Sequence, residues 1–287
     1  MDRKNFIKRS IALSVAGVIA PSVLQSKQST YDKLLDQVGF NHIPNEENKT
    51  MNTVLHKAET RGHANHGWLD SHHSFSFANY HNPDRMHFGV LRVLNDDKVA
   101  AGKGFGKHPH DNMEIISIPL EGDLEHQDSM GNVATIKQGD VQVMSAGTGV
   151  FHSEYNKNSD ADVKFLQIWL FPKTKNVEPR YDQISIGTIE KRNEFSQILS
   201  PTKDDQGVWI HQDAWFYLGK FDSDVTLKHQ LKKSGNGFYI FVLEGKVIVE
   251  GQELSRRDGF GLWDLTEINI KSSNDSHVLL MEVPMNL

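Results

Sequence analysis

Two short histidine motifs carry the residue types that could bind a metal ion. His108 and His110 are separated by one residue, and further along the chain His152 and Glu154 repeat that spacing. On an extended strand, residues i and i+2 point to the same face of the sheet, so each pair can direct both side chains at one ion. If β pairing brings the pairs together, they form a site of three histidines and one carboxylate. This ligand set suits Fe(II) and similar divalent metals and leaves positions open for substrate or oxygen.

The alternative is that these motifs occur by chance and bind no metal. The chain has 15 histidines, and a single His-x-His among so many would usually be structural or solvated. Two such pairs in a strand-like context punctuated by glycine favour the metal site. Cysteine is absent, which excludes disulfides, thiolate ligands and a cysteine nucleophile. Any metal must therefore be bound through nitrogen and oxygen.

Length and charge narrow the class of protein. The chain has 287 residues, enough for two medium domains, and a formal net charge of −6. No basic cluster lies outside the extreme N-terminus, so we expect no nucleic-acid partner. The hydrophobic content of 38% is normal for a soluble protein.

The first 50 residues differ from the rest. Residues 1–25 have the layout of a secretory signal: a basic head, an apolar run from Ile11 to Ala20, and Pro21 after it. The head resembles the twin-arginine export motif but has Lys4 where a second arginine is expected. Residues 26–50 are polar and read as a linker. We therefore predict export to the periplasm, with membrane contact only through an uncleaved signal. The alternative is an uncut tail on a cytoplasmic protein.

From residue 51 onwards the pattern predicts β-strands. Short runs rich in branched and aromatic residues, such as residues 163–171, alternate with Gly, Asn and Asp clusters. The order of turns over residues 118–140 recurs over residues 241–259, which indicates a duplicated β motif. We therefore expect an all-β chain with two antiparallel barrel domains, at residues 51–175 and 176–287. The second copy has no His-x-His and offers His229 alone, so the metal should bind in the first.

Several blocks of the chain resemble one family. They are RGHANHGWLD (61–70), FGKHPH (105–110), LEHQDSMGN (124–132), SAGTG (145–149), HSEYN (152–156) and FLQIW (165–169). In these blocks the chain resembles the pirin family of bicupins, particularly its bacterial quercetin dioxygenase-like branch. The resemblance implies two cupin (jelly-roll) barrels, of which the N-terminal one binds metal.

The resemblance leaves two glutamates as candidates for the carboxylate ligand. The general cupin pattern would use Glu114, whereas the pirin pattern points to Glu154, which we adopt. Glu114 is then expected to hydrogen-bond a ligand histidine and fix its tautomer. Of the side chains in and after the first block, we expect the histidines to be structural hydrogen-bonders and the aromatic residues to be core: His63, His66, His72, His73, Trp68, Phe75 and Phe77.

The activity implied by the resemblance is ring-opening oxygenation of a flavonol or similar enediol-like phenol by O2. Glu154 or Glu114 would take the substrate proton. We expect one divalent metal in each monomeric chain, Fe(II) by preference, although the same ligands accept Ni, Mn, Co, Cu or Zn. The alternative is a metal-binding regulatory protein without catalysis.

Overall fold

The computed structural model describes residues 51–287, which consist of β-strands joined by turns. The signal-like segment (1–25) and the linker (26–50) lie outside the described residues. The helical elements of the described part are short 3-10 turns: η1 (Ala58–Thr60), η2 (Pro83–Arg85) and η3 (Ile186–Thr188). Within this part, none of the helices has the length and apolar character needed to cross a membrane.

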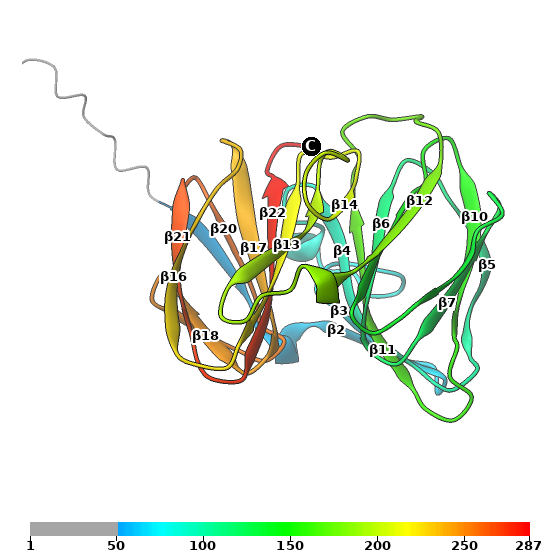
Figure 1. Ribbon diagram of the computed structural model, residues 1–287, viewed down its shortest axis with the longest axis horizontal. Coiled ribbons are helices and arrows are strands. Elements are labelled where there is room, and N and C mark those ends of the chain that lie inside the picture. Colours follow the sequence, from blue (N-terminus) through cyan, green and yellow to red (C-terminus); the bar gives the residue numbers. More distant parts are fainter. Residues whose placement is uncertain (1–50) are drawn as a thin grey trace, which may run out of the picture. The chain divides into compact units, whose positions relative to one another are not determined.

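The N-terminal barrel is a sandwich of two sheets, drawn mainly in cyan and green in Figure 1. Its seven-stranded sheet has the order β12 (Arg180–Ser185), β9 (Asp140–Ser145), β6 (Glu114–Glu121), β11 (Val163–Leu170), β4 (Leu91–Val99), β3 (Leu69–His73) and β2 (Gly62–Asn65). Its four-stranded sheet has the order β5 (Gly104–His110), β10 (Val150–Asn156), β7 (Leu124–Asp128) and β8 (Val133–Ile136). Phe165 of the large sheet packs with Leu124 and Ile136 of the small sheet.

The C-terminal barrel repeats this plan. Its seven-stranded sheet has the order β1 (Asn52–His56), β20 (Gly259–Trp263), β17 (Asn236–Glu244), β22 (Ser276–Pro284), β15 (Trp215–Phe221), β13 (Phe195–Ser200) and β14 (Val208–Trp209). Its four-stranded sheet has the order β16 (Val225–Gln230), β21 (Glu267–Ser272), β18 (Lys246–Val249) and β19 (Gln252–Ser255). The expected all-β fold of two antiparallel barrels is therefore confirmed.

The internal repeat seen in the sequence is also present in the strand pairing. In the first barrel β6 pairs with β9 and β7 pairs with β8. In the second barrel β17 pairs with β20 and β18 pairs with β19. The two segments with the same order of turns thus form equivalent strands of equivalent sheets.

The expected boundaries at residues 51 and 175/176 are not those of the sheets, because two edge strands are exchanged. β1 comes from the N-terminal half of the chain but pairs with β20 of the C-terminal barrel. β12 follows residue 175 but pairs with β9 of the N-terminal barrel. Each exchanged strand covers one edge of the other half's large sheet, where unpaired backbone groups would otherwise be exposed. Local sequence predicts a strand but not its partner.

The two large sheets pack against each other through one hydrophobic cluster. Ile116 and Ile118 of β6 lie in this cluster with Phe241 and Leu243 of β17. Side chains alternate along a strand, so the residues between them point into the N-terminal barrel. Each large sheet therefore has one face toward the other barrel and one face toward its own interior, and the second face carries the site.

Candidate metal centre

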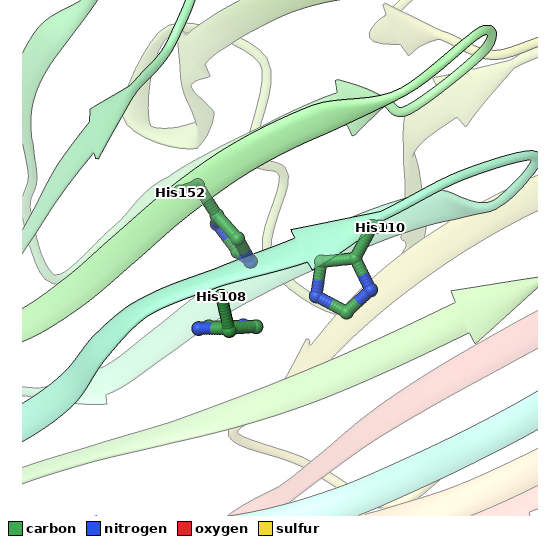
Figure 2. Close-up of side chains that lie close together, drawn as sticks. All are labelled: His108, His110 and His152. Atoms are coloured by element: carbon green, nitrogen blue, oxygen red, sulfur yellow. The ribbon is translucent and has the colours of Figure 1, made fainter.

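Three histidines converge where β5 meets β10. The antiparallel register places His108 directly opposite His152, and His110 lies two residues further along β5. Figure 2 shows the three imidazole rings gathered together, two from one strand and one from its neighbour. The ring centroids are 4.4–4.9 Å apart, and the nitrogens that could bind a metal all lie within 4.8 Å of one another. The predicted pairing of the two motifs is present.

The strand β5 approaches β10 very closely beside this cluster, at a bulge. The register shifts between His152 and Glu154, so that Glu154 lies opposite Phe105 and Tyr155 opposite Gly104. A Cβ atom on Gly104 would lie 2.2 Å from the carbonyl oxygen of Glu154. Only glycine fits this contact, which holds the two ligand-bearing strands together.

The histidine nitrogens have the pattern expected of metal ligands. His108 Nδ1 donates to the carbonyl oxygen of Gly106 at 2.8 Å, so Nε2 is the ring nitrogen that remains available to a metal. His110 Nε2 and both ring nitrogens of His152 are buried and have no hydrogen-bond partner. Buried polar atoms are normally paired, so these orphaned nitrogens fit a divalent metal that binds nitrogen.

The protonation states agree with this assignment. Burial, with a smaller effect of His108, lowers the pKa of His110 to about 4. Burial and the neighbouring histidines lower the pKa of His152 to about 2. Both rings are therefore neutral at neutral pH, which is the form that binds metals.

Glu154 is buried beside the three histidines and is held by the wall of the large sheet. Its Oε1 accepts a hydrogen bond from Ser117 Oγ at 3.0 Å, and its Oε2 accepts one from Gln167 Nε2 at 2.7 Å. Burial raises the pKa of this carboxyl to about 7. One of its oxygens lies within 4.8 Å of ligand atoms of His152 and His126. The carboxylate of Glu154 therefore forms one group with His152 and His126. His152 also belongs to the cluster that it forms with His108 and His110.

His126 was not predicted as part of the site. It lies directly opposite Glu154 on β7, is fully buried, and has an unpaired Nδ1. Its Nε2 hydrogen-bonds to Asp128 Oδ2 at 3.1 Å. A signal was available, because His126 and Asp128 also have i, i+2 spacing. The hydrogen bond between them fixes the orientation of the His126 ring, which packs against the His152 ring with 5.4 Å between centroids.

The role expected for Glu114 is wrong. Its neighbour Ile115 packs inside the barrel with Met144, whereas Glu114 lies on the opposite face of β6. Its Oε2 accepts a hydrogen bond from Ser145 Oγ at 2.7 Å, and its carboxylate also accepts from the backbone N–H of His211. Burial raises its pKa to about 7. Glu114 therefore belongs to the contact between the barrels and cannot orient a ligand histidine.

A pocket of about 250 Å³ opens beside the histidines. This volume is slightly below the usual range for small-molecule sites, roughly 300–1,000 Å³. His108, His110 and Glu154 line one part of it, and the rings of Phe77, Phe105 and Trp169 form apolar walls. The pocket therefore places aromatic walls directly beside the histidine cluster.

The side chains expected to be structural divide into two groups. Phe75 is buried in the core, as expected, and His63 Nε2 hydrogen-bonds to Asp70 Oδ1 at 2.7 Å. His66, His73 and Phe77, however, line the pocket. Ser71, Asn95 and Asp97 line it as well and were not singled out by the sequence.

Comparisons with known proteins identify relatives of this chain. The Pirin family model matches residues 26–170, and the model of the quercetinase C-terminal cupin domain matches residues 197–283. A quercetin 2,3-dioxygenase of Escherichia coli K12 is 45% identical over 230 residues, covering 80% of this chain and 98% of the relative. A pirin-like protein of Caulobacter vibrioides is 37% identical, covering 77% of this chain and 95% of the relative.

A solved structure resembles the described fold and contains a metal. It is the bacterial pirin YhhW of Escherichia coli in complex with nickel(II). It superimposes with a TM-score of 0.77 at 44% sequence identity and covers 81% of this chain and 99% of that one.

Proposed function

Because the chain belongs to the pirin family, we propose that it is a metal-dependent dioxygenase that opens the oxygen-containing ring of a flavonol-type phenol. The observation that carries this proposal is the cluster of His108, His110 and His152, whose ligand nitrogens lie within 4.8 Å of one another beside an aromatic-walled pocket. The name of the Escherichia coli relative, quercetin 2,3-dioxygenase, supports the same reaction and substrate class.

We propose that His108, His110, His152 and Glu154 together hold one divalent metal. Three neutral imidazoles and one carboxylate would leave a charge of +1 on a divalent ion, which suits an anionic phenolate. Our choice is Fe(II), because histidine and carboxylate ligands with open positions are typical of non-haem iron oxygenases. Nickel is present in the similar structure, and the donor set also accepts it. When bound, such an ion favours the deprotonated substrate hydroxyl and holds the substrate where O2 can react.

The protein side chains would bind the substrate and move its proton. We assign the proton acceptor to Glu154, whose carboxylate lines the pocket, and not to Glu114, which faces the other barrel. Phe77, Phe105 and Trp169 would hold a planar ring and exclude water.

Oxygen consumption tests this proposal. Protein reconstituted with Fe(II) under anaerobic conditions and then mixed with aerated quercetin should consume oxygen and lose the flavonol absorption band. The metal-free protein should do neither. If the Fe(II) protein consumes no oxygen with any flavonol or catechol, the proposed activity is wrong.

We further propose that residues 1–25 direct the chain to the periplasm. The support is the basic head followed by the apolar run in the sequence. Cell fractionation should find the full chain in the periplasm and a chain beginning at Met51 in the cytoplasm. If both chains are distributed equally between periplasm and cytoplasm, the export proposal is wrong.

A further inference from the structure

A row of polar side chains crosses the inner face of the large N-terminal sheet. Its members are consecutive cross-strand partners on β3, β4, β11, β6 and β9: His73, Asn95, Gln167, Ser117 and Gln142. All of them are buried. A polar row inside a barrel costs free energy unless each group is hydrogen-bonded, so we ask what each member binds.

The middle of the row holds the carboxylate of the metal centre. Ser117 and Gln167 both donate to Glu154, which accounts for these two side chains. The two ends are different, because His73 Nδ1, Asn95 Oδ1 and both amide atoms of Gln142 have no partner. His73 and Asn95 line the pocket, whereas Gln142 does not.

The hydrogen bonds around His73 determine which of its nitrogens carries the proton. Burial lowers the pKa of His73 to about 4, so the ring is neutral at neutral pH. Ser71 Oγ donates its proton to Asp97 Oδ1, and His73 Nε2 lies 2.8 Å from Ser71 Oγ. Because the O–H of Ser71 is directed at Asp97, Ser71 Oγ accepts a hydrogen bond from His73 Nε2–H. His73 Nδ1 is then a bare acceptor.

Two unpaired, buried acceptors therefore belong to neighbouring residues of the pocket lining. His73 and Asn95 are directly opposed on β3 and β4, and opposed side chains lie roughly 5 Å apart at Cβ. His73 Nδ1 and Asn95 Oδ1 both need donors. The matching ligand group has two neighbouring O–H donors on a flat ring, which is a catechol.

We propose that His73 and Asn95 form a subsite that binds the two adjacent hydroxyls of a catechol ring, while the metal centre binds another part of the same molecule. This inference rests on the proposed function, since it names the class of flavonol that the pocket prefers. The Ser71–Asp97 pair acts behind His73 as a positioning pair, because it fixes the tautomer that leaves Nδ1 as an acceptor.

Three flavonols that differ only in this ring provide the test. Quercetin has two adjacent B-ring hydroxyls, kaempferol has one and galangin has none, while all three keep the same hydroxy-ketone for the metal. Equilibrium dialysis against the metal-loaded protein without oxygen measures their affinities and requires no turnover. We expect each hydroxyl to strengthen binding by roughly tenfold. Equal affinities for the three flavonols, or no binding of any, would overturn the subsite.

Substitutions then locate the effect. Asn95→Leu keeps the approximate shape and should lower the quercetin-to-galangin affinity ratio by roughly tenfold. His73→Phe should do the same and serves as a second variant. Gln142→Leu is the matched control, since it removes an equally buried amide of the same row that does not line the pocket; its ratio should stay as in the native protein. If the quercetin-to-galangin affinity ratio is unchanged in both the Asn95 and the His73 variant, the assignment of the subsite is wrong.

Oxygen uptake separates this inference from the proposed function. If dialysis shows different affinities for the three flavonols but the protein consumes no oxygen, the subsite is supported and the proposed dioxygenase activity is wrong. If the protein consumes oxygen but binds the three flavonols equally, the dioxygenase activity is supported and the subsite is wrong.

Discussion

The side chains of the site differ in the number of hydrogen bonds that hold them in place. His108 is fixed by a single hydrogen bond to its own strand, whereas Glu154 is held by two side chains from two other strands. A metal bound by these residues therefore links β5 and β10 to the large sheet. Loss of a ligand should affect metal binding more than folding, because the hydrophobic clusters inside both barrels remain.

The first prediction concerns His108. His108→Ala removes one ligand of the cluster and should strip most of the bound metal while the protein stays folded. Metal analysis of the purified variant, with circular dichroism as the check on folding, gives the result. His229→Ala is the control, because His229 packs among aromatic rings in the other barrel and should not affect metal content. Equal metal retention in the two variants would show the assignment to be wrong.

The second prediction separates the two glutamates. Glu154→Gln removes the charged ligand and should weaken metal binding by more than the roughly 10–100-fold typical of a residue that only supports a ligand. Glu114→Gln should leave metal affinity unchanged, because Glu114 faces the other barrel. Competition titration with a chelating dye measures both. Weak binding in the Glu114 variant and normal binding in the Glu154 variant would return the carboxylate ligand to the general cupin position.

Residue spacing could predict the three histidines but not the rest of the pocket. His-x-His and His-x-Glu are local patterns whose geometry follows from the period of a strand. Glu114 was misplaced because β6 is buried on both faces, so its sequence has no polar side to show which residues point inward. Asn95 and Asp97 belong to a run of four polar residues in β4, residues 95–98, which does not show what these side chains contact. Their grouping with His73 depends on the pairing of β3 with β4, which one strand's sequence does not contain.

At the scale of elements, the contact between β5 and β10 sets the geometry of the cluster. The sequence predicted several strands closely, as residues 163–171 became β11 (Val163–Leu170). It did not predict the bulge at Glu154 or the exchange of β1 and β12, because both depend on partners distant along the chain.

The third prediction tests the close approach of these strands. Gly104→Ala places a Cβ 2.2 Å from the Glu154 carbonyl oxygen and 2.5 Å from Tyr155 Cα, so β5 must move away from β10. We expect the free energy of unfolding to fall by about 1–3 kcal/mol and metal affinity to fall with it. Gly106→Ala is the matched control, since its Cβ would meet only Tyr155 Oη, at 3.9 Å. Urea unfolding and metal titration of both variants provide the comparison, and equal behaviour would contradict the role given to the bulge.

At the scale of the whole described molecule, the contact between the barrels contains a titratable group. Glu114 is buried there with Ser145, the backbone of His211 and the nearby Arg180. Its contribution to stability should depend on pH, and this dependence is independent of the metal centre on the other face of β6.

The fourth prediction follows from the raised pKa of Glu114. Burial raises the pKa of Glu114 from 4.5 to about 7, so the folded state binds the proton more tightly than the unfolded state. The stability due to this group is complete below pH 4.5 and is lost as pH rises through about 7. The loss is on the order of 3 kcal/mol. Glu114→Gln should remove it, so the difference in unfolding free energy between native and variant proteins should change between pH 4.5 and 8. A difference independent of pH would contradict the raised pKa.

The fifth prediction concerns the N-terminal end of the described fold. A chain beginning at Met51 keeps β1 and should be soluble, bind one metal and retain activity. A chain beginning at Lys57 lacks β1, which exposes the β20 edge and removes the hydrogen bond between His56 Nδ1 and Tyr239 Oη at 2.9 Å. We expect this shorter chain to aggregate or unfold at lower temperature. If the chain beginning at Met51 aggregates or loses metal, residues 1–50 contribute to the fold and the export proposal fails with it.

The fate of isotopic oxygen tests the central claim most directly. The Fe(II)-loaded protein would be mixed with quercetin under ¹⁸O₂, and the products analysed by mass spectrometry. A dioxygenase working at His108, His110, His152 and Glu154 should place both labelled atoms in the ring-opened products, with one O2 consumed for each flavonol. His152→Ala should abolish this labelling. Unlabelled products, labelled hydrogen peroxide in place of ring opening, or full labelling by the His152 variant would contradict the account.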